Sequence, residues 1–241
     1  MRDAQQINLP FFYYEKVADP GNTFVMDEAT SKHIVQVLRM QTGEQLQLTD
    51  GKGNLLTAEI TDNNKKRCAV TSLEILVIDH PPFTVTIAIS LIKNVNRFEW
   101  FLEKATEIGV NEIIPLICER TEKQNFRYDR MKTIVVSAML QSQQCWLPVL
   151  HEPKKIETVL PGSPHQQKFI AHCMEEEKRN LADMVNENLS SKIILIGPEG
   201  DFTKNEIEMA VQHHFIPVAL GNNRLRTETA GIVGATLLTQ L

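Results

Sequence analysis

The sequence predicts an α/β domain with a mostly parallel sheet, preceded by a smaller β-rich domain. From about residue 76 onward, short apolar runs alternate with longer stretches of helical periodicity, which is typical of a parallel sheet covered on both faces. Before that point, polar and apolar residues alternate in short runs between turn signals, as in a small antiparallel sheet or barrel. We therefore expect domains at 1–75 and 76–241, with the change of pattern completed at the stiff pair Pro81-Pro82.

The composition is that of an ordinary globular protein, with 42% hydrophobic and 23% charged residues. Its four cysteines are far apart and form no CxxC pair, so we expect no structural zinc and no other metal. A secretory signal and a long apolar run are both missing, which favours a soluble protein of the reducing cytoplasm. The net charge of −5 argues against a general polyanion binder but leaves room for a local basic groove.

In the first domain, EQLQLTDGKGNLLTAEI at residues 44–60 predicts two strands joined by a glycine-containing turn. One helix is expected over SKHIVQVLRM at residues 31–40, because Ile34, Val37 and Leu38 share a face. Ser31 is the candidate N-cap of this helix, and Gly43 follows its end.

Strands and helices alternate through the second domain. Buried strands are expected over VTIAISL (85–91), NEIIPLI (111–117), KFIAHCM (168–174), KIILIG (192–197) and IPVALG (216–221). Helices are expected over residues 96–109, 130–145, 204–214 and 229–241. Lys104 and Glu107 are expected on a solvated helix face that carries salt bridges.

The strongest local signal is the turn GPEG at residues 197–200, which ends a predicted buried strand. Thr203 and Glu206 follow as a capping box for the next helix. Ligands of open α/β sheets bind at the carboxyl ends of strands, and glycines let the backbone approach them closely. An ordinary strand-to-helix loop is the alternative interpretation, and the P-loop and GxGxxG patterns are missing.

A second glycine-ended strand leads into NNRLRTETAG, a short basic loop before the last predicted helix. Two such loops can build one pocket from backbone amides and carbonyls, with Arg224, Arg226 and Glu228 at its rim. The alternative is a solvated loop in which Glu228 only complements the helix dipole. Gly231 and Gly234 are also compatible with close helix packing alone.

These residues resemble the small-subunit ribosomal RNA uridine-N3 methyltransferases, the RsmE family of the SPOUT class. The similarity is carried by GPEGDFTKNEIE and LGNNRLRTETA and extends over nearly the whole chain. Further matching segments are HIVQVLRM, LTDGKGN, K-x-x-x-R-x-E with EKATEIGVNEIIPLICER, and AMLQSQQCWLP.

The resemblance implies a PUA-like β-barrel followed by an α/β domain of the SPOUT type, knotted as a trefoil around S-adenosyl-L-methionine (SAM). It also implies a homodimer whose substrate is 16S rRNA or the assembled small ribosomal subunit. The implied cofactor-binding residues are Ile196, Gly197, Gly200, Leu220, Gly221, Leu225 and Ala230, and His172 at a strand end is a further candidate. The candidate RNA contacts are Arg39, Lys93, Arg97 and Arg120.

The chain departs from the family pattern at two positions. Asp201 stands where the family usually has a second glycine after GPEG, and Gln144 stands where it usually has an arginine. The second change removes one expected basic contact. The family's amino-terminal Arg-Phe-Phe arrangement is stretched in this chain. Arg2 lies well before Phe11-Phe12, so it matches that arrangement only in part.

The function implied is SAM-dependent methylation of N3 of one uridine in 16S rRNA. Because uridine N3 is protonated at neutral pH, the site must favour loss of that proton, by a base or by a cation near the uracil oxygens. Arg226 is the candidate cation, and Glu228 is its orienting partner or the base. The alternatives are a binding-only RNA protein, and a methyltransferase of the same class that acts on a ribose hydroxyl or a transfer RNA base.

Overall fold

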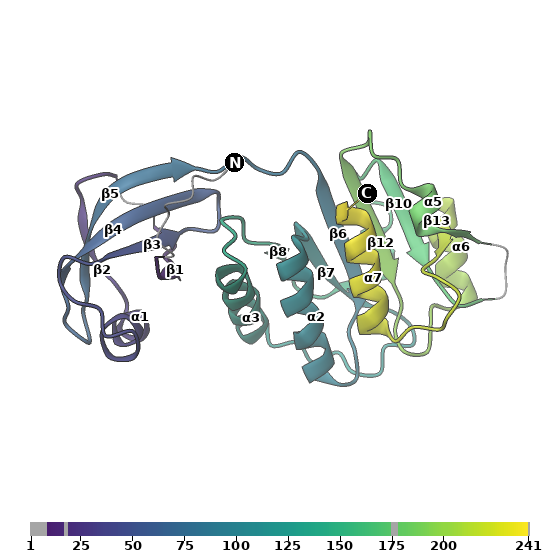
Figure 1. The fold of residues 1–241 in the computed structure, drawn as a ribbon. Coiled ribbons are helices and arrows are strands. Elements are labelled where there is room, and N and C mark those ends of the chain that lie inside the picture. Colours follow the sequence, from purple (N-terminus) through teal and green to yellow (C-terminus); the bar gives the residue numbers. More distant parts are fainter. Residues whose placement is uncertain (1–8, 17–18, 175–177, 241) are drawn as a thin grey trace. The chain divides into compact units, whose positions relative to one another are not determined.

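The computed structural model describes residues 9–16, 19–174 and 178–240 of the chain, so Arg2 lies outside the described residues. The chain forms two compact units (Figure 1). Unit 1 runs to His80 and also includes Met139–Leu147, whereas unit 2 comprises Pro81–Ala138 and Pro148–Leu241. The division into domains at 1–75 and 76–241 stays a prediction.

Unit 1 contains a curled five-stranded sheet. Its order is β1 (Phe11–Tyr13), β3 (Gln45–Thr49), β4 (Asn54–Asp62), β5 (Ala69–Val77) and β2 (Thr23–Val25). The expected strand pair over residues 44–60 is confirmed as β3 and β4. The sheet is antiparallel as predicted except at one edge, where β1 pairs with β3 in parallel. The alternating apolar residues of β3 and β4, such as Leu46, Leu48 and Ile60, face the core.

The helix of unit 1 begins earlier than predicted. Helix α1 (Glu28–Lys32) is capped by Asp27, whose carboxylate accepts hydrogen bonds from the backbone N–H groups of Ala29 (2.9 Å) and Thr30 (3.0 Å). It continues as the π-helix η1 (His33–Val37). The prediction of Ser31 as N-cap is therefore wrong, because its buried hydroxyl donates to the Met26 carbonyl (3.1 Å) inside the unit instead.

Residues 139–147 belong to unit 1 because they pair with the turn between β3 and β4. The N–H of Gly53 donates to the Cys145 carbonyl, and the N–H of Leu147 donates to the Gly51 carbonyl, each at 2.9 Å. Gly53 has φ of 91°, and a side chain there would overlap the Trp146 ring. Trp146 is thus a packing residue of unit 1.

Unit 2 contains an eight-stranded sheet, and every pairing in it is parallel, as predicted. The main path is β11 (Arg179–Asn180), β13 (Ile216–Ala219), β10 (Gln167–Ala171), β12 (Ser191–Ile196), β6 (Thr84–Ser90), β7 (Glu112–Ile117) and β8 (Val149–Leu150). Strand β9 (Lys154–Lys155) also pairs with β7.

Helices cover both faces of this sheet (Figure 1). Helices α2 (Val95–Ile108) and α7 (Thr227–Gln240) pack on one face, where Gly231 of α7 comes so close to Phe101 that a larger residue would overlap the ring. On the other face, Ile193 and Leu195 of β12 pack with Phe202 and α6 (Lys204–Gln212). The remaining helices are α3 (Tyr128–Gln141), α4 (Ile156–Val159) and α5 (Leu181–Met184).

Neither unit contains, among its described residues, a helix with the length and apolar character needed to cross a bilayer. The described residues also hold no group of three or more His, Cys, Asp or Glu side chains that could bind a metal ion.

Candidate functional site

The first glycine-containing loop joins β12 to α6. Its capping box is confirmed: the N–H of Glu206 donates to the Thr203 hydroxyl (3.3 Å), and the N–H of Thr203 donates to the Glu206 carboxylate (2.7 Å). Asp201 has φ of 65° in the left-handed region, which explains why glycine suits this position. Its carboxylate accepts hydrogen bonds from the N–H groups of Cys173 (2.8 Å) and Phe202 (2.9 Å).

The second loop joins β13 to α7 and contains residues 220–226. Gly221 has φ of 120°, a conformation that side-chain-bearing residues rarely adopt. Helix α7 begins at Thr227, so the loop ends at a helix N-terminus with Glu228 in the first turn. Both loops follow the carboxyl ends of parallel strands, and β10 lies between those two strands in the sheet.

Two cavities adjoin these loops. The first has a volume of about 380 Å³ and is lined by Arg97, Ala171, Cys173, residues 196–199, Asp201, residues 224–227 and Ala230. The second has a volume of about 370 Å³ and is lined by residues 171–173, Lys178, residues 218–225 and Ala230. They share five lining residues, namely Ala171, Cys173, Arg224, Leu225 and Ala230. Each volume falls in the range of about 300–1,000 Å³ that is usual for small-molecule sites.

Basic side chains line both cavities, whereas acidic side chains line only the first. Three arginines line the first, namely Arg97, Arg224 and Arg226. Two acids line the first cavity as well: Asp201 accepts from the N–H groups named above, and Glu199 accepts from the N–H of Lys93 (3.0 Å). The second cavity is lined mainly by small or apolar side chains, together with Arg224 and with Lys178, which donates to the His172 carbonyl (2.9 Å).

Most of the predicted site residues come together at these cavities. The first contains Ile196, Gly197, Leu225, Ala230, Arg97 and Arg226, and the second contains His172, Leu220 and Gly221 as well as Leu225 and Ala230. Glu228 is not a lining residue. It is buried beside the first cavity, with its Oε1 3.6 Å from Nε of Arg97.

Four predicted residues lie elsewhere. The Arg120 guanidinium donates to the Gly200 carbonyl (2.8 Å), so these two residues meet each other and do not line either cavity. Lys93 pairs with Glu122 (2.6 Å) at an exposed position. Arg39 belongs to unit 1 and follows η1 with φ of 58°.

Sequence reasoning missed several lining residues. Ala171 ends β10 and Cys173 follows it. This strand carries no glycine signal, and only the pairing of β10 with β12 and β13 brings the two residues beside the loops. Asn222, Asn223 and Thr227 stand inside the second loop motif and could have been selected with their neighbours.

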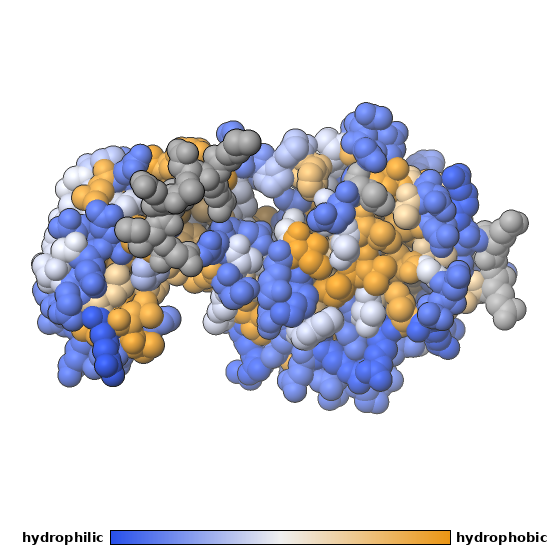
Figure 2. Space-filling model, in the orientation of Figure 1, coloured by the Kyte–Doolittle hydropathy of each residue, from blue (hydrophilic) through white to orange (hydrophobic). Residues whose placement is uncertain are grey.

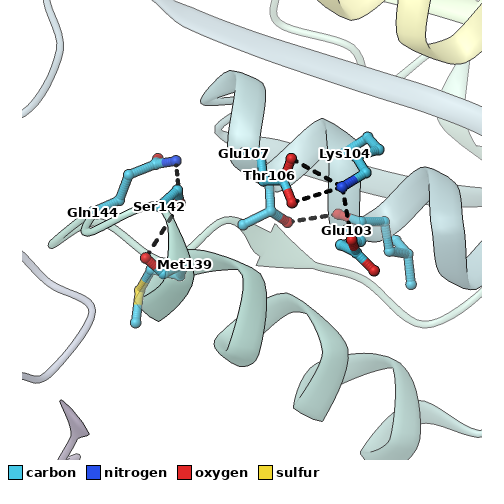
Figure 3. Close-up of polar contacts among 8 residues, drawn as sticks. Glu103, Lys104, Thr106, Glu107, Met139, Ser142 and Gln144 are labelled. Atoms are coloured by element: carbon cyan, nitrogen blue, oxygen red, sulfur yellow. Dashed lines mark hydrogen bonds and ion pairs between the residues drawn. The ribbon is translucent and has the colours of Figure 1, made fainter. Parts of the chain in front are cut away.

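Gln144 and Lys104 are polar residues that line neither cavity. Gln144 donates to the Ser142 hydroxyl (2.8 Å), which in turn donates to the Met139 carbonyl (3.3 Å), a local network within unit 1 (Figure 3). The salt bridges predicted for Lys104 are confirmed, because its ammonium group contacts Glu107 (2.9 Å) and Glu103 (2.7 Å) on α2 (Figure 3).

Comparison with known proteins gives concordant results. A family model described as an RNA methyltransferase domain matches residues 79–239, and one described as an RNA methyltransferase PUA domain matches residues 27–71. The ribosomal RNA small subunit methyltransferase E of Synechocystis is 30% identical over 226 residues, covering 91% of this chain and 73% of that protein.

Two crystal structures are similar over nearly the whole chain. A Porphyromonas gingivalis protein described as an rRNA methyltransferase is 35% identical, with a TM-score of 0.88 and coverage of 96% of this chain and 99% of its own. The ribosomal RNA small subunit methyltransferase E of Neisseria gonorrhoeae, bound to SAM, is 29% identical, with a TM-score of 0.86 and coverage of 96% and 97%.

The fold and the paired loops thus define an RNA methyltransferase of the knotted SPOUT type, preceded by a PUA-like domain, which confirms the fold class expected from the resemblance. The family matches make the assignment specific. The chain belongs to the ribosomal RNA small subunit methyltransferase E family.

Proposed function

We propose that this chain is a SAM-dependent methyltransferase that modifies N3 of one uridine in 16S rRNA. The observation that carries the proposal is the pair of adjoining cavities between two strand-end loops, within a chain of the methyltransferase E family. One cavity can receive a small cofactor while the other admits a nucleotide next to it.

The residues present fit the cofactor. Leu220, Leu225 and Ala230 offer apolar surfaces to a purine ring, and the glycine-containing loops expose backbone groups for its polar edges. Gly221 keeps one wall of the second cavity free of a side chain. When bound, SAM supplies an electrophilic methyl group on a sulfonium centre, and alignment of the acceptor is the protein's main contribution.

Arg226 is the residue that we propose to favour the uridine anion. It lines the first cavity, and a guanidinium there stabilises negative charge on the uracil oxygens as the N3 proton leaves. Glu228 remains the orienting residue or base of this proposal, and its nearest ionic partner is Arg97.

The RNA contacts of the proposal lie in both units. Arg97 acts inside the first cavity, whereas Lys93 and Arg120 bind phosphates on the surface of unit 2. Arg39 of unit 1 binds the RNA backbone at an exposed position. Phosphate contacts of this kind position the substrate without reading its sequence.

We further propose that the protein is a homodimer acting on the small subunit or its rRNA in the cytoplasm. Apolar side chains are exposed on the face of unit 2 that carries α2 and α7 (Figure 2), where Trp100 is 44% exposed and Ile232, Val233 and Leu237 are half-buried. A second copy would bury this surface across a two-fold axis.

The test is mass mapping of methylated nucleotides in 16S rRNA from cells with and without this protein. We expect a single 3-methyluridine to be lost with the protein and restored by adding the purified protein and SAM to subunits. A binding-only protein would leave the methylation map unchanged, and a different lost nucleotide would reassign the target.

A further inference from the structure

The Arg97–Glu228 ion pair crosses from α2 to α7 beside the first cavity. Its two members are unequally exposed, because the Arg97 side chain is 40% exposed and lines the cavity whereas the Glu228 side chain is 9% exposed and does not. The pair therefore joins a ligand-facing cation to a buried anion behind it.

Burying the Glu228 carboxylate removes it from water, which costs free energy unless hydrogen bonds or ion pairs replace those with water. Its Oε2 atom is inaccessible to solvent and accepts no hydrogen bond from any of the described residues, and the 3.6 Å contact of Oε1 with Arg97 is longer than a hydrogen bond. The positive end of α7 favours an acid in its first turn, but an exposed acid would gain that benefit without desolvation. The helix dipole alone thus does not account for a buried carboxylate here.

Arg97 presents a cation to the first cavity, which favours an anionic ligand. A contact through Nε leaves the N–H groups of the two terminal guanidinium nitrogens for a bidentate partner, a geometry that matches phosphate. Arg224 and Arg226 line the same cavity, so its three guanidinium groups outnumber its two carboxylates, those of Glu199 and Asp201. SAM carries a net positive charge, so the RNA backbone is the better match for this wall.

We propose that Glu228 is a positioning residue that holds the Arg97 guanidinium against the first cavity, where it binds the phosphodiester next to the target nucleotide. The inference rests on the proposed rRNA methyltransferase function. It assigns Glu228 an effect on RNA that is transmitted through Arg97, in place of direct proton transfer.

The test combines Arg97→Ala, Glu228→Gln and the double variant. For each we would measure kcat and KM for rRNA, the Kd of SAM by calorimetry, and RNA affinity against salt by fluorescence anisotropy. Glu208→Gln is the matched control, because Glu208 forms a pair of similar length with Lys204 (3.7 Å) at an exposed site on α6. Glu228→Asp keeps the charge but retracts it, which covers the case that Glu228→Gln does not fold.

Both single variants should raise the KM for rRNA about tenfold, as expected for a lost contact to a charged group. Arg97→Ala should also reduce the salt slope of binding by about 0.7, the value for one phosphate of a single strand. SAM affinity should be unchanged, and the double variant should be no worse than Arg97→Ala. Glu208→Gln should behave as the wild type.

Three results would overturn the inference. Wild-type KM in folded Glu228→Gln or Glu228→Asp would show that Glu228 positions nothing, and multiplying effects in the double variant would show that the residues act independently. A tenfold weaker SAM affinity in Arg97→Ala would identify the cofactor carboxylate as the anion. Failure of the proposed function is distinct, because the wild type would then methylate no rRNA while the salt slope would still test Arg97.

Discussion

Asp201 and Cys173 are joined by a 2.8 Å hydrogen bond from the backbone N–H of Cys173 to the carboxylate of Asp201. This contact connects the first loop to the segment after β10, two parts of the chain that line the first cavity together. At this left-handed position, a residue with a side chain connects the loop to the segment after β10 by a hydrogen bond that glycine could not make.

Asp201→Ala should lower the free energy of unfolding by about 1–3 kcal/mol, because it leaves the N–H of Cys173 without its acceptor. Asp201→Gly should lower the free energy of unfolding by less, because glycine adopts the left-handed conformation at φ of 65° without strain. Urea unfolding of the two variants separates the two effects. An equal decrease in the free energy of unfolding in both variants would mean that backbone strain at residue 201 is negligible.

Gly221→Ala should weaken SAM binding more than Gly200→Ala does. Gly221 has φ of 120°, where alanine is strained, whereas a Cβ atom at Gly200 would meet Cδ of Arg120 at an ordinary 3.4 Å. Larger replacements by valine at the two positions should preserve this order. Calorimetry with SAM measures the difference, and unchanged affinity in both valine variants would place the cofactor elsewhere.

Cys173 should be the thiol that reports occupancy of the site. It is exposed and lines both cavities, whereas Cys68, Cys118 and Cys145 are buried, and burial raises the pKa of Cys118 to about 12. A thiol reagent should therefore label Cys173 first in the native protein, and SAM should slow that labelling. Cys173→Ser is the control, and an unchanged labelling rate with saturating SAM would contradict the proposed pocket.

Arg226→Ala and Arg39→Ala should affect different steps. Loss of Arg226 should lower the single-turnover rate at saturating RNA and SAM by about a hundredfold, as for removal of one oxyanion-stabilising group. Loss of Arg39 should weaken RNA binding in a salt-dependent way and leave that rate largely intact. Equal, small effects on the rate would mean that Arg226 is only another phosphate contact.

The lowered pKa of His165 should decrease the free energy of unfolding in mild acid. Burial lowers the pKa of His165 below the usual histidine value of 6.5, and the imidazole is hydrogen-bonded to Thr86 (2.8 Å) and Ser163 (2.9 Å). The unfolded chain therefore binds more protons than the folded one as the pH falls below 6.5, so the free energy of unfolding decreases there.

The dependence can be isolated with His165→Gln. Glu112 and Lys168 act on the His165 pKa in opposite directions, and both remain in this variant. Urea unfolding should show that the free energy of unfolding decreases less between pH 7.5 and pH 5 in His165→Gln than in the wild type. An identical loss in both proteins would show that other groups cause the acid sensitivity.

Local patterns in the sequence determined much of the architecture. Periods of two and of 3.6 residues depend on near neighbours, so β3, β4 and α2 were predicted close to their observed bounds. The sequence also predicts the capping box of Thr203 and Glu206, because all the contacts of this motif lie within one helical turn. The glycine-ended strands likewise marked both loops of the site.

Tertiary structure decided which of these residues meet. Cys173 reaches the cavity only because β10 pairs between β12 and β13, and strand order is not encoded in local periodicity. Ser31 was predicted as a cap but donates inside unit 1, since Asp27 already satisfies the first N–H groups of α1. The contact of Glu228 with Arg97 depends on the packing of α7 against α2, whose residues are far apart in sequence, and only the folded chain brings that carboxylate to that guanidinium.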